Sequence, residues 1–168
     1  MESWNADDVV IEPDTNVLLA LGRRDRMCRE FAGYPSLVPE LNGNAARVTG
    51  RLPDAAQVPL LLDTGRAVEF AFDVRPAVAK AGARLRLHSS DQSATGARIR
   101  AELNGQPFET SVAPGYGLQK SDPAHLAKAE TSTISIPAGN LKAGENSLRI
   151  TITGDGWLSW DSLDLVAE

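Results

Sequence analysis

The chain of 168 residues has few of the residue types that most often perform chemistry. Cys28 is the only cysteine, which excludes an internal disulfide and any cysteine-rich metal site. The two histidines, His88 and His125, are too few for most metal centres or nucleophile–base triads. Aromatic residues make up 5% of the sequence, so few rings are available for a broad binding platform.

A basic excess and long apolar runs are also missing. The formal net charge is -5 and the pI about 5.1, which argues against electrostatic binding to nucleic acid or to an anionic membrane. No window approaches the roughly 18 apolar residues that a membrane-spanning helix requires. The first residues, MESWNADDVVIEPD, lack the basic and apolar regions of a signal peptide. We expect either an intracellular protein or a domain excised from a longer one.

Alternation of apolar and polar residues predicts β-strands along most of the chain. In residues 67–74 (AVEFAFDV) large apolar side chains occupy every second position from Val68 to Val74, and residues 84–88 and 98–103 also alternate. Residues 133–165 read as strand, tight turn, strand, short aromatic loop and closing strand. This pattern is typical of antiparallel strands with one buried face.

The turns between these strands are short. Asn104-Gly105 is a dipeptide favoured in type I′ hairpin turns, where both central residues need a positive φ. Pro59 reduces the apolar run at 58–62 to an edge strand or a loop. Short turns without a βαβ rhythm predict an all-β fold, an antiparallel β-sandwich of the jelly-roll type. We expect one domain over residues 1–168.

Helical signals are scarce. Short helices are predicted at Arg24–Phe31 and at Pro123–Glu130. Two long irregular segments, residues 32–54 and 109–130, complete the chain. Long loops in compact domains are often functional, so ligand contacts are expected where these loops decorate the sandwich.

Several motifs resemble the C-terminal β-sandwich of family 4 rhamnogalacturonan lyases, a galactose-binding-domain-like fold. They are an early glycine–aspartate–glutamate–phenylalanine segment, an asparagine–glycine hairpin, the run IPAGNLKAGEN and the closing strand WDSLDL. The matching positions are Gly22, Asp25, Glu30, Phe31, Asn104, Gly105, Pro137, Leu141, Gly144, Asn146, Asp161, Leu163 and Leu165. The resemblance implies a non-catalytic carbohydrate-binding module of a secreted polysaccharide-degrading enzyme. Its partners would be a poly- or oligosaccharide and an adjacent catalytic domain, with neither nucleic acid nor membrane.

Trp157, Trp160 and Tyr116 are the candidate sugar contacts, because sugar rings stack their C–H faces on aromatic rings. In the register of the closing strand, Leu163 and Leu165 share one face and Trp160 lies on the other. If the leucines face the core, Trp160 points outward unless a bulge intervenes. The alternative for both tryptophans is structural packing where strands converge, and Tyr116 could equally anchor its loop.

Arginines form a second candidate group. Arg84, Arg86, Arg98 and Arg100 are expected on the outward faces of two strands. Adjacent strands would combine them into a basic patch that could bind uronic-acid carboxylates through paired hydrogen bonds. The more ordinary alternative is a solvated sheet face whose arginines pair with acidic residues such as Glu69, Asp73 and Glu102.

The resemblance also implies a structural Ca²⁺ near the meeting of the first and last strands. Asp161 with Glu12 or Asp14 could contribute ligands, because Ca²⁺ prefers six to eight oxygens. The favoured alternative is that backbone N–H groups or an arginine bind the Asp161 carboxylate.

Catalytic motifs of the common enzyme classes do not occur in the sequence. There is no G-x-S-x-G elbow, H-E-x-x-H pair, P-loop or dinucleotide fingerprint, and His125 has no identifiable partner. No catalytic residue is therefore assigned. Two alternatives to sugar binding remain, a structural sandwich without ligand affinity and a small hydrolase or lyase with its site in the long loops.

Overall fold

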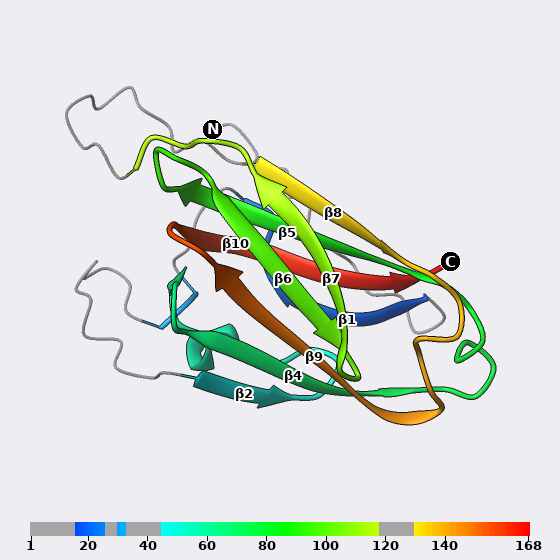
Figure 1. The fold of residues 1–168 in the computed structure, drawn as a ribbon. Helices are drawn as coiled ribbons and strands as arrows, with labels where there is room; N and C mark the ends of the chain where they lie inside the picture. Colours follow the sequence, from blue (N-terminus) through cyan, green and yellow to red (C-terminus); the bar gives the residue numbers. More distant parts are fainter. Residues whose placement is uncertain (1–15, 26–29, 33–44, 118–129) are drawn as a thin grey trace, which may run out of the picture.

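The computed structural model of the chain describes residues 16–25, 30–32, 45–117 and 130–168. These residues are mostly strands (Figure 1), which confirms the all-β prediction. The strands are β1 (Val17–Gly22), β2 (Ala45–Thr49), β3 (Leu61–Asp63), β4 (Ala67–Val74), β5 (Ala83–Gln92), β6 (Ala97–Leu103), β7 (Gln106–Val112), β8 (Glu130–Ile136), β9 (Gly144–Thr153) and β10 (Trp157–Ala167).

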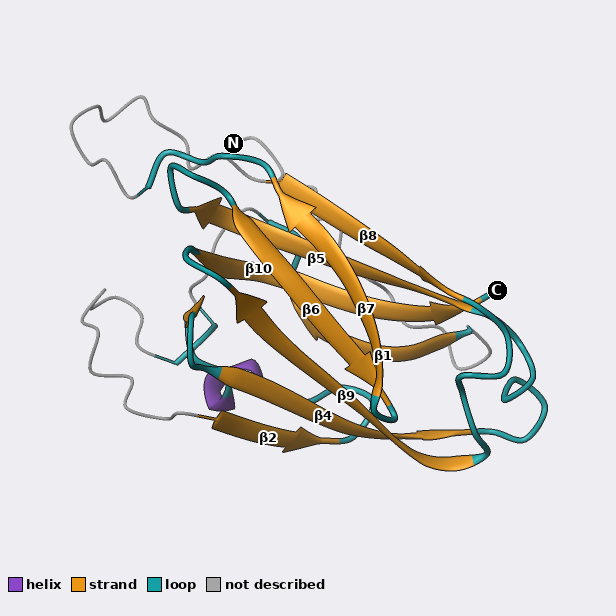
Figure 2. Ribbon diagram, viewed as in Figure 1, coloured by secondary structure: helices purple, strands orange, loops and turns teal. Residues whose placement is uncertain are grey.

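Helix is limited, in the described part of the chain, to one 3-10 turn, η1 (Ala55–Gln57), drawn in purple in Figure 2. Half of the predicted helix at Arg24–Phe31, residues 26–29, and all of that at Pro123–Glu130 except its last residue lie outside the described residues. No described helix has the length and apolar character needed to span a membrane.

The strands form two sheets. The first has the order β1-β10-β5-β8, with β3 paired to the first residues of β10. The second has the order β2-β4-β9-β6-β7, with β2 parallel to β4 and the other neighbours antiparallel. Strands β5 and β6, although consecutive in the chain, therefore belong to different sheets.

The core lies between the two sheets and follows the alternation of the sequence. In β4, Val68 and Phe70 are fully buried whereas Asp73 is exposed. Ile150 and Leu148 of β9 pair with Val68 and Phe70 and are fully buried as well. Each such side chain contributes about 1.5–3 kcal/mol when removed from water. Alternation in the sequence thus translates directly into the buried face of the second sheet.

Pro59 has the predicted effect on the apolar run at 58–62. Only the end of that run forms a strand, the three-residue β3, whereas Pro59 makes an isolated bridge with Ala32. Proline has no N–H to donate to a sheet, so it cannot extend a central strand.

Two β-bulges interrupt the pairing of β5 with β10. The register includes one additional residue on β5, Ser90, and one on β10, Asp161. An additional residue reverses which side chains face the core beyond it, because side chains alternate along a strand. The core-facing residues of β10 are therefore Leu158 and Trp160 before the bulge and Leu163 and Leu165 after it.

Asn104 and Asn146 tie the β6–β7 hairpin to the turn that precedes β9. Asn104 and Gly105 have φ values of 52° and 85°, as the dipeptide predicts. The Asn146 amide, 1% exposed, donates to the carbonyls of Lys142 and Gly144 at 2.8 Å each. Its oxygen accepts from the Lys142 N–H at 3.0 Å and from Nδ2 of Asn104 at 2.8 Å. Two turns distant in sequence are thereby held together.

Candidate functional site

Trp160 lies inside the sandwich, so the prediction of an exposed face at this residue is wrong. Its side chain is 0% exposed, and its ring stacks on Phe31 with 6.4 Å between the ring centroids. Strict alternation from Leu163 and Leu165 would have turned Trp160 outward. Because Asp161 is an additional residue in the pairing with β5, the alternation shifts by one position, and the indole of Trp160 points into the core.

Trp157 and Tyr116 are the described aromatic residues that lie outside the core. Trp157 is half-buried, and Tyr116 is 42% exposed. The remaining described aromatic rings are buried or packed against the core, namely Phe31, Phe70, Phe72, Phe108 and Trp160. Two of the three predicted aromatic contacts thus remain accessible to a ligand.

Ser93, directly after β5, connects the segments that carry these two rings. Its N–H donates to the Trp157 carbonyl at 3.0 Å, and its carbonyl accepts the Gly115 N–H at 2.9 Å. The N–H of Tyr116 donates to Oδ1 of Asp91 at 3.0 Å. Two hydrogen-bonded steps, each about 5 Å between backbones, therefore link Trp157 through Ser93 to Gly115, the residue before Tyr116. We call Asp91, Ser93, Tyr116 and Trp157 the aromatic end.

The aromatic end occupies the left-hand end of the sandwich in Figure 1, where β5 and β9 finish and β6 and β10 begin. Its loops approach closely because of Gly115 and Gly156. A Cβ at Gly115 would lie 2.4 Å from the carbonyl oxygen of Gln92 and 2.7 Å from Oδ1 of Asp91. Gly156 has a φ of 127°, and a Cβ there would lie 2.6 Å from the carbonyl oxygen of Gly96. Larger residues would force these loops apart.

Buried hydrogen bonds between β5 and β10 hold Asp91 of the aromatic end in place. Asp91 is 4% exposed, and its N–H donates to Oγ of Ser159 at 3.0 Å. That hydroxyl lies 2.7 Å from Oγ of Ser90. Neither Asp91 nor Ser93 could be found from sequence spacing, because their partners Tyr116 and Trp157 are 25 and 64 positions away.

The four candidate arginines lie on two different sheets. Arg84 and Arg86 are on β5, and Arg98 and Arg100 are on β6. A joint basic patch required adjacent strands, and this condition is not met. The outward faces of two packed sheets point in opposite directions, so the expectation of one patch is corrected to two separate pairs.

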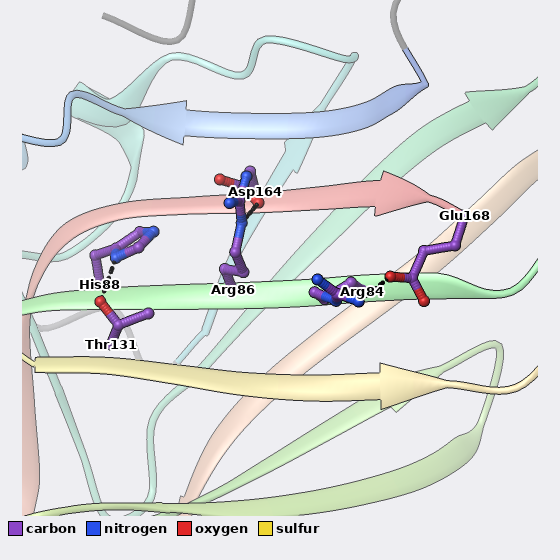
Figure 3. A network of polar contacts seen from close by, with 6 residues as sticks. All are labelled: Arg84, Arg86, His88, Thr131, Asp164 and Glu168. Carbon is purple, nitrogen blue, oxygen red and sulfur yellow. Dashed lines mark hydrogen bonds and ion pairs between the residues drawn. The ribbon is translucent and has the colours of Figure 1, made fainter. Parts of the chain in front are cut away.

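Three of the four arginines, Arg84, Arg86 and Arg100, contact acidic residues. Figure 3 shows Arg86, whose Nε lies 2.7 Å from Oδ1 of Asp164, and Arg84, which pairs with the Glu168 carboxylate. On the other sheet, Nη2 of Arg100 lies 3.5 Å from Oε1 of Glu102. These contacts match the alternative of a solvated face with paired charges.

His88 lies beside the Arg86–Asp164 pair and is 4% exposed (Figure 3). Its Nδ1 is 2.8 Å from Oγ1 of Thr131. Burial lowers the pKa of His88 below 6.5, and the Arg24 charge lowers this pKa further, followed by Arg86, while Asp164 raises it. The imidazole is therefore neutral at pH 7 and serves as a hydrogen-bonding residue of the sheet face.

Asp161 is 2% exposed, and its Oδ1 accepts the N–H of Asp25 at 3.2 Å. Glu12 and Asp14, its predicted partners at a calcium site, lie outside the described residues. Within the described ranges, no three acidic, histidine or cysteine side chains are grouped so that they could hold a metal ion. These residues alone do not supply the six to eight oxygens of a Ca²⁺ site, and calcium binding stays a prediction.

No protein-family model and no curated protein matches the chain. Solved structures that resemble it include CBM35 from Cellvibrio japonicus Abf62, with 19% identity and a TM-score of 0.46, covering 62% of this chain and 67% of that one. The carbohydrate-binding module CBM36 in complex with calcium and xylotriose has 11% identity and a TM-score of 0.46, and the match covers 66% of this chain and 82% of that one.

The Podospora anserina GH26-CBM35 β-(1,4)-mannanase has 17% identity and a TM-score of 0.38, and the match covers 61% of this chain but 19% of the enzyme. All three TM-scores lie below 0.5. The likeness by itself therefore establishes neither a shared fold nor a shared ligand.

Proposed function

We propose that the chain is a non-catalytic carbohydrate-binding module whose ligand contacts Trp157 and Tyr116. The observation that carries the proposal is that the described aromatic rings fall into two groups, one in or against the core and the other accessible to a ligand. The core accounts for the other described rings and leaves these two accessible at one end of the sandwich. The resemblance of the turns and the closing strand to a carbohydrate-binding domain supplies the ligand class.

The chemistry of the aromatic end suits sugars. Sugar rings present C–H faces that pack on indole and phenol rings, while their hydroxyls need hydrogen-bond partners. The backbone of Tyr116 is held by Asp91, and that of Trp157 by Ser93. Because both segments are fixed before a ligand arrives, binding loses less conformational entropy than it would with free loops.

The resemblance to family 4 rhamnogalacturonan lyases extends the proposal to a biological context. It makes rhamnogalacturonan the first polysaccharide to test. Residues 1–168 would form one domain of a secreted polysaccharide-degrading enzyme, beside a catalytic domain of the same polypeptide. A structural Ca²⁺ held by Asp161, Glu12 and Asp14 belongs to the same proposal.

Isothermal titration calorimetry against rhamnogalacturonan, galactan, xylan and mannan oligosaccharides tests the binding. We expect Trp157→Ala to weaken the binding of the best ligand at least about tenfold, taking as the guide the loss, on the order of 1–3 kcal/mol, when an aromatic ring under a stacked base is removed from a nucleic-acid-binding protein. Tyr116→Ala should weaken it less, because this ring is more exposed. Leu52→Ala removes another exposed apolar side chain, 63% exposed, and should leave affinity unchanged.

Two results would contradict the proposal. Absence of binding to every polysaccharide, with the melting curve of a folded domain, would favour a structural sandwich without ligand affinity. Turnover of rhamnogalacturonan by the isolated chain, lost on His125→Ala, would favour an enzyme instead.

A further inference from the structure

Asn104 and Gly105 form a dipeptide with the chemistry needed for spontaneous deamidation. In this reaction the backbone nitrogen of Gly105 attacks Cγ of Asn104, and the side-chain nitrogen leaves as ammonia together with the proton of the Gly105 N–H. The product is a cyclic succinimide, which water opens to aspartate or isoaspartate. Glycine favours the attack, because no side chain shields its nitrogen. Both residues are exposed, so water has access to the turn.

The side-chain amide of Asn104 is hydrogen-bonded through every one of its polar groups. Oδ1 accepts the Ser147 N–H at 3.1 Å. Nδ2 donates to the Asn140 carbonyl at 2.9 Å and to Oδ1 of Asn146 at 2.8 Å, which uses both of its hydrogens. Ammonia can leave only after both donated bonds break. We call these three hydrogen bonds the Asn104 clamp, and they oppose the reaction.

The partners in the Asn104 clamp are held firmly by the second sheet. Asn146 is 1% exposed. Ser147 lies in β9 and pairs with Ala71 of β4, and its carbonyl accepts the backbone N–H of Asn104 at 2.8 Å. The clamp therefore opens only when the β6–β7 turn separates from β9. Such local unfolding is rarer in a strand-bound turn than in a free loop.

We propose that Asn104 is a latent deamidation site, protected by the clamp in the folded domain and reactive when the β6–β7 turn opens. The change is irreversible. At pH 7 aspartate and isoaspartate have no side-chain N–H, so neither can donate to the Asn140 carbonyl or to Asn146, and the clamp cannot form again. Isoaspartate also lengthens the backbone of a turn that fits between the paired residues Leu103 and Gln106. Deamidation thus releases the hairpin from the turn before β9.

Peptide mapping by mass spectrometry measures the rate of deamidation at pH 7.4 and 37 °C. Trypsin releases residues 101–120, in which Asn104 is the only asparagine, and residues 30–47, which contain a second such dipeptide, Asn42-Gly43. In guanidinium chloride the two dipeptides should react at similar rates, because only the local sequence matters in an unfolded chain. In the folded protein Asn104 should react at least about tenfold more slowly than in guanidinium chloride. Equal rates of Asn104 in the two conditions would overturn the proposal.

A pair of variants separates the clamp from global stability. Asn146→Ala removes the acceptor of one Nδ2 hydrogen and should accelerate deamidation of folded protein about threefold to tenfold. Val48→Ala removes buried apolar surface from β2, which pairs with β4 and not with the hairpin, and should leave the rate of Asn104 unchanged. Both rates are measured well below each melting temperature. Equal acceleration by the two variants would mean that global unfolding, rather than the clamp, controls the reaction. The comparison with guanidinium chloride tests the proposal even where Asn146→Ala does not fold.

Asn104→Asp reproduces one product of the reaction. Its melting temperature should fall by about 2–5 °C, because two donated hydrogen bonds are lost. Asn16→Asp makes the same change of charge at an exposed residue and should shift the melting temperature by less than about 1 °C. Sugar affinity should not change, because β6 begins at the aromatic end and its hairpin turn lies at the opposite end of the strand. Equal melting temperatures of Asn104→Asp and the unmodified protein would overturn the release of the hairpin.

Discussion

Asn146→Asp is expected to destabilise the domain severely although the change replaces only an amide nitrogen with oxygen. Nδ2 of Asn146 donates to the carbonyls of Lys142 and Gly144, both at 2.8 Å, and the residue is 1% exposed. A carboxylate cannot donate to either carbonyl. Each carbonyl left without its donor costs about 1–3 kcal/mol, so the loss is about 2–6 kcal/mol for the pair.

Urea unfolding at pH 7 measures this loss, with Asn140→Asp as the control. The Asn140 amide also donates to a carbonyl, that of Pro137 at 2.8 Å, but this bond is exposed to water. The control should therefore cost less than about 1 kcal/mol. Burial raises the pKa of the introduced carboxyl, so the penalty should be largest above that pKa and shrink as the pH falls and the group protonates. A free energy of unfolding for Asn146→Asp within about 0.5 kcal/mol of the control would refute this reasoning.

Three further outcomes are expected. The pKa of His88 is lowered in the folded state, so the free energy of unfolding should decrease as pH falls below 6.5, by at most about 1.4 kcal/mol per pH unit, until the folded pKa is reached. Urea unfolding between pH 7.5 and 5 measures this decrease, and His88→Gln should remove the contribution of His88. An unchanged pH dependence in His88→Gln would contradict the prediction. Gly115→Ala should cost about 1–3 kcal/mol and also weaken sugar binding, because the new Cβ would displace the Tyr116 segment; full affinity in calorimetry would contradict the role given to this loop. Calcium should raise the melting temperature over that in a chelator, and Asp161→Ala should abolish the increase, whereas identical melting curves would exclude the predicted Ca²⁺ site.

Local patterns were sufficient for most of the fold. The alternation in residues 67–74 predicts a strand with Val68 and Phe70 in the core, and both are fully buried. Asn104-Gly105 predicts a hairpin turn with two positive φ values, and both are observed. These features depend on neighbouring residues only, because side-chain alternation and turn conformations are set within a few positions of the chain.

The candidate site was less predictable. The prediction that Trp160 is exposed was wrong because a β-bulge reverses which side chains of β10 point into the core. The sequence around Trp160 carries no clear signal of this bulge. The prediction of one basic patch from four arginines was wrong because it assumed that β5 and β6 are neighbours. Strand order in a sandwich depends on contacts between residues that are distant in sequence. Trp157 and Tyr116 were identified as candidates from their residue types, but their proximity depends on Ser93 and Asp91, whose partners are distant in sequence.

Composition, periodicity and turn residues were sufficient to predict the class of the fold, the positions of the principal strands and turns, and the small set of aromatic residues that could contact a ligand. Only the three-dimensional arrangement shows which of those rings are accessible, which arginines share a face, and that Asp63 lies opposite Trp157. Periodicity and turn conformation depend on residues a few positions apart. In contrast, the sheet face that a side chain occupies, the partner of each strand and the burial of each side chain depend on hydrogen bonds between strands far apart in the chain.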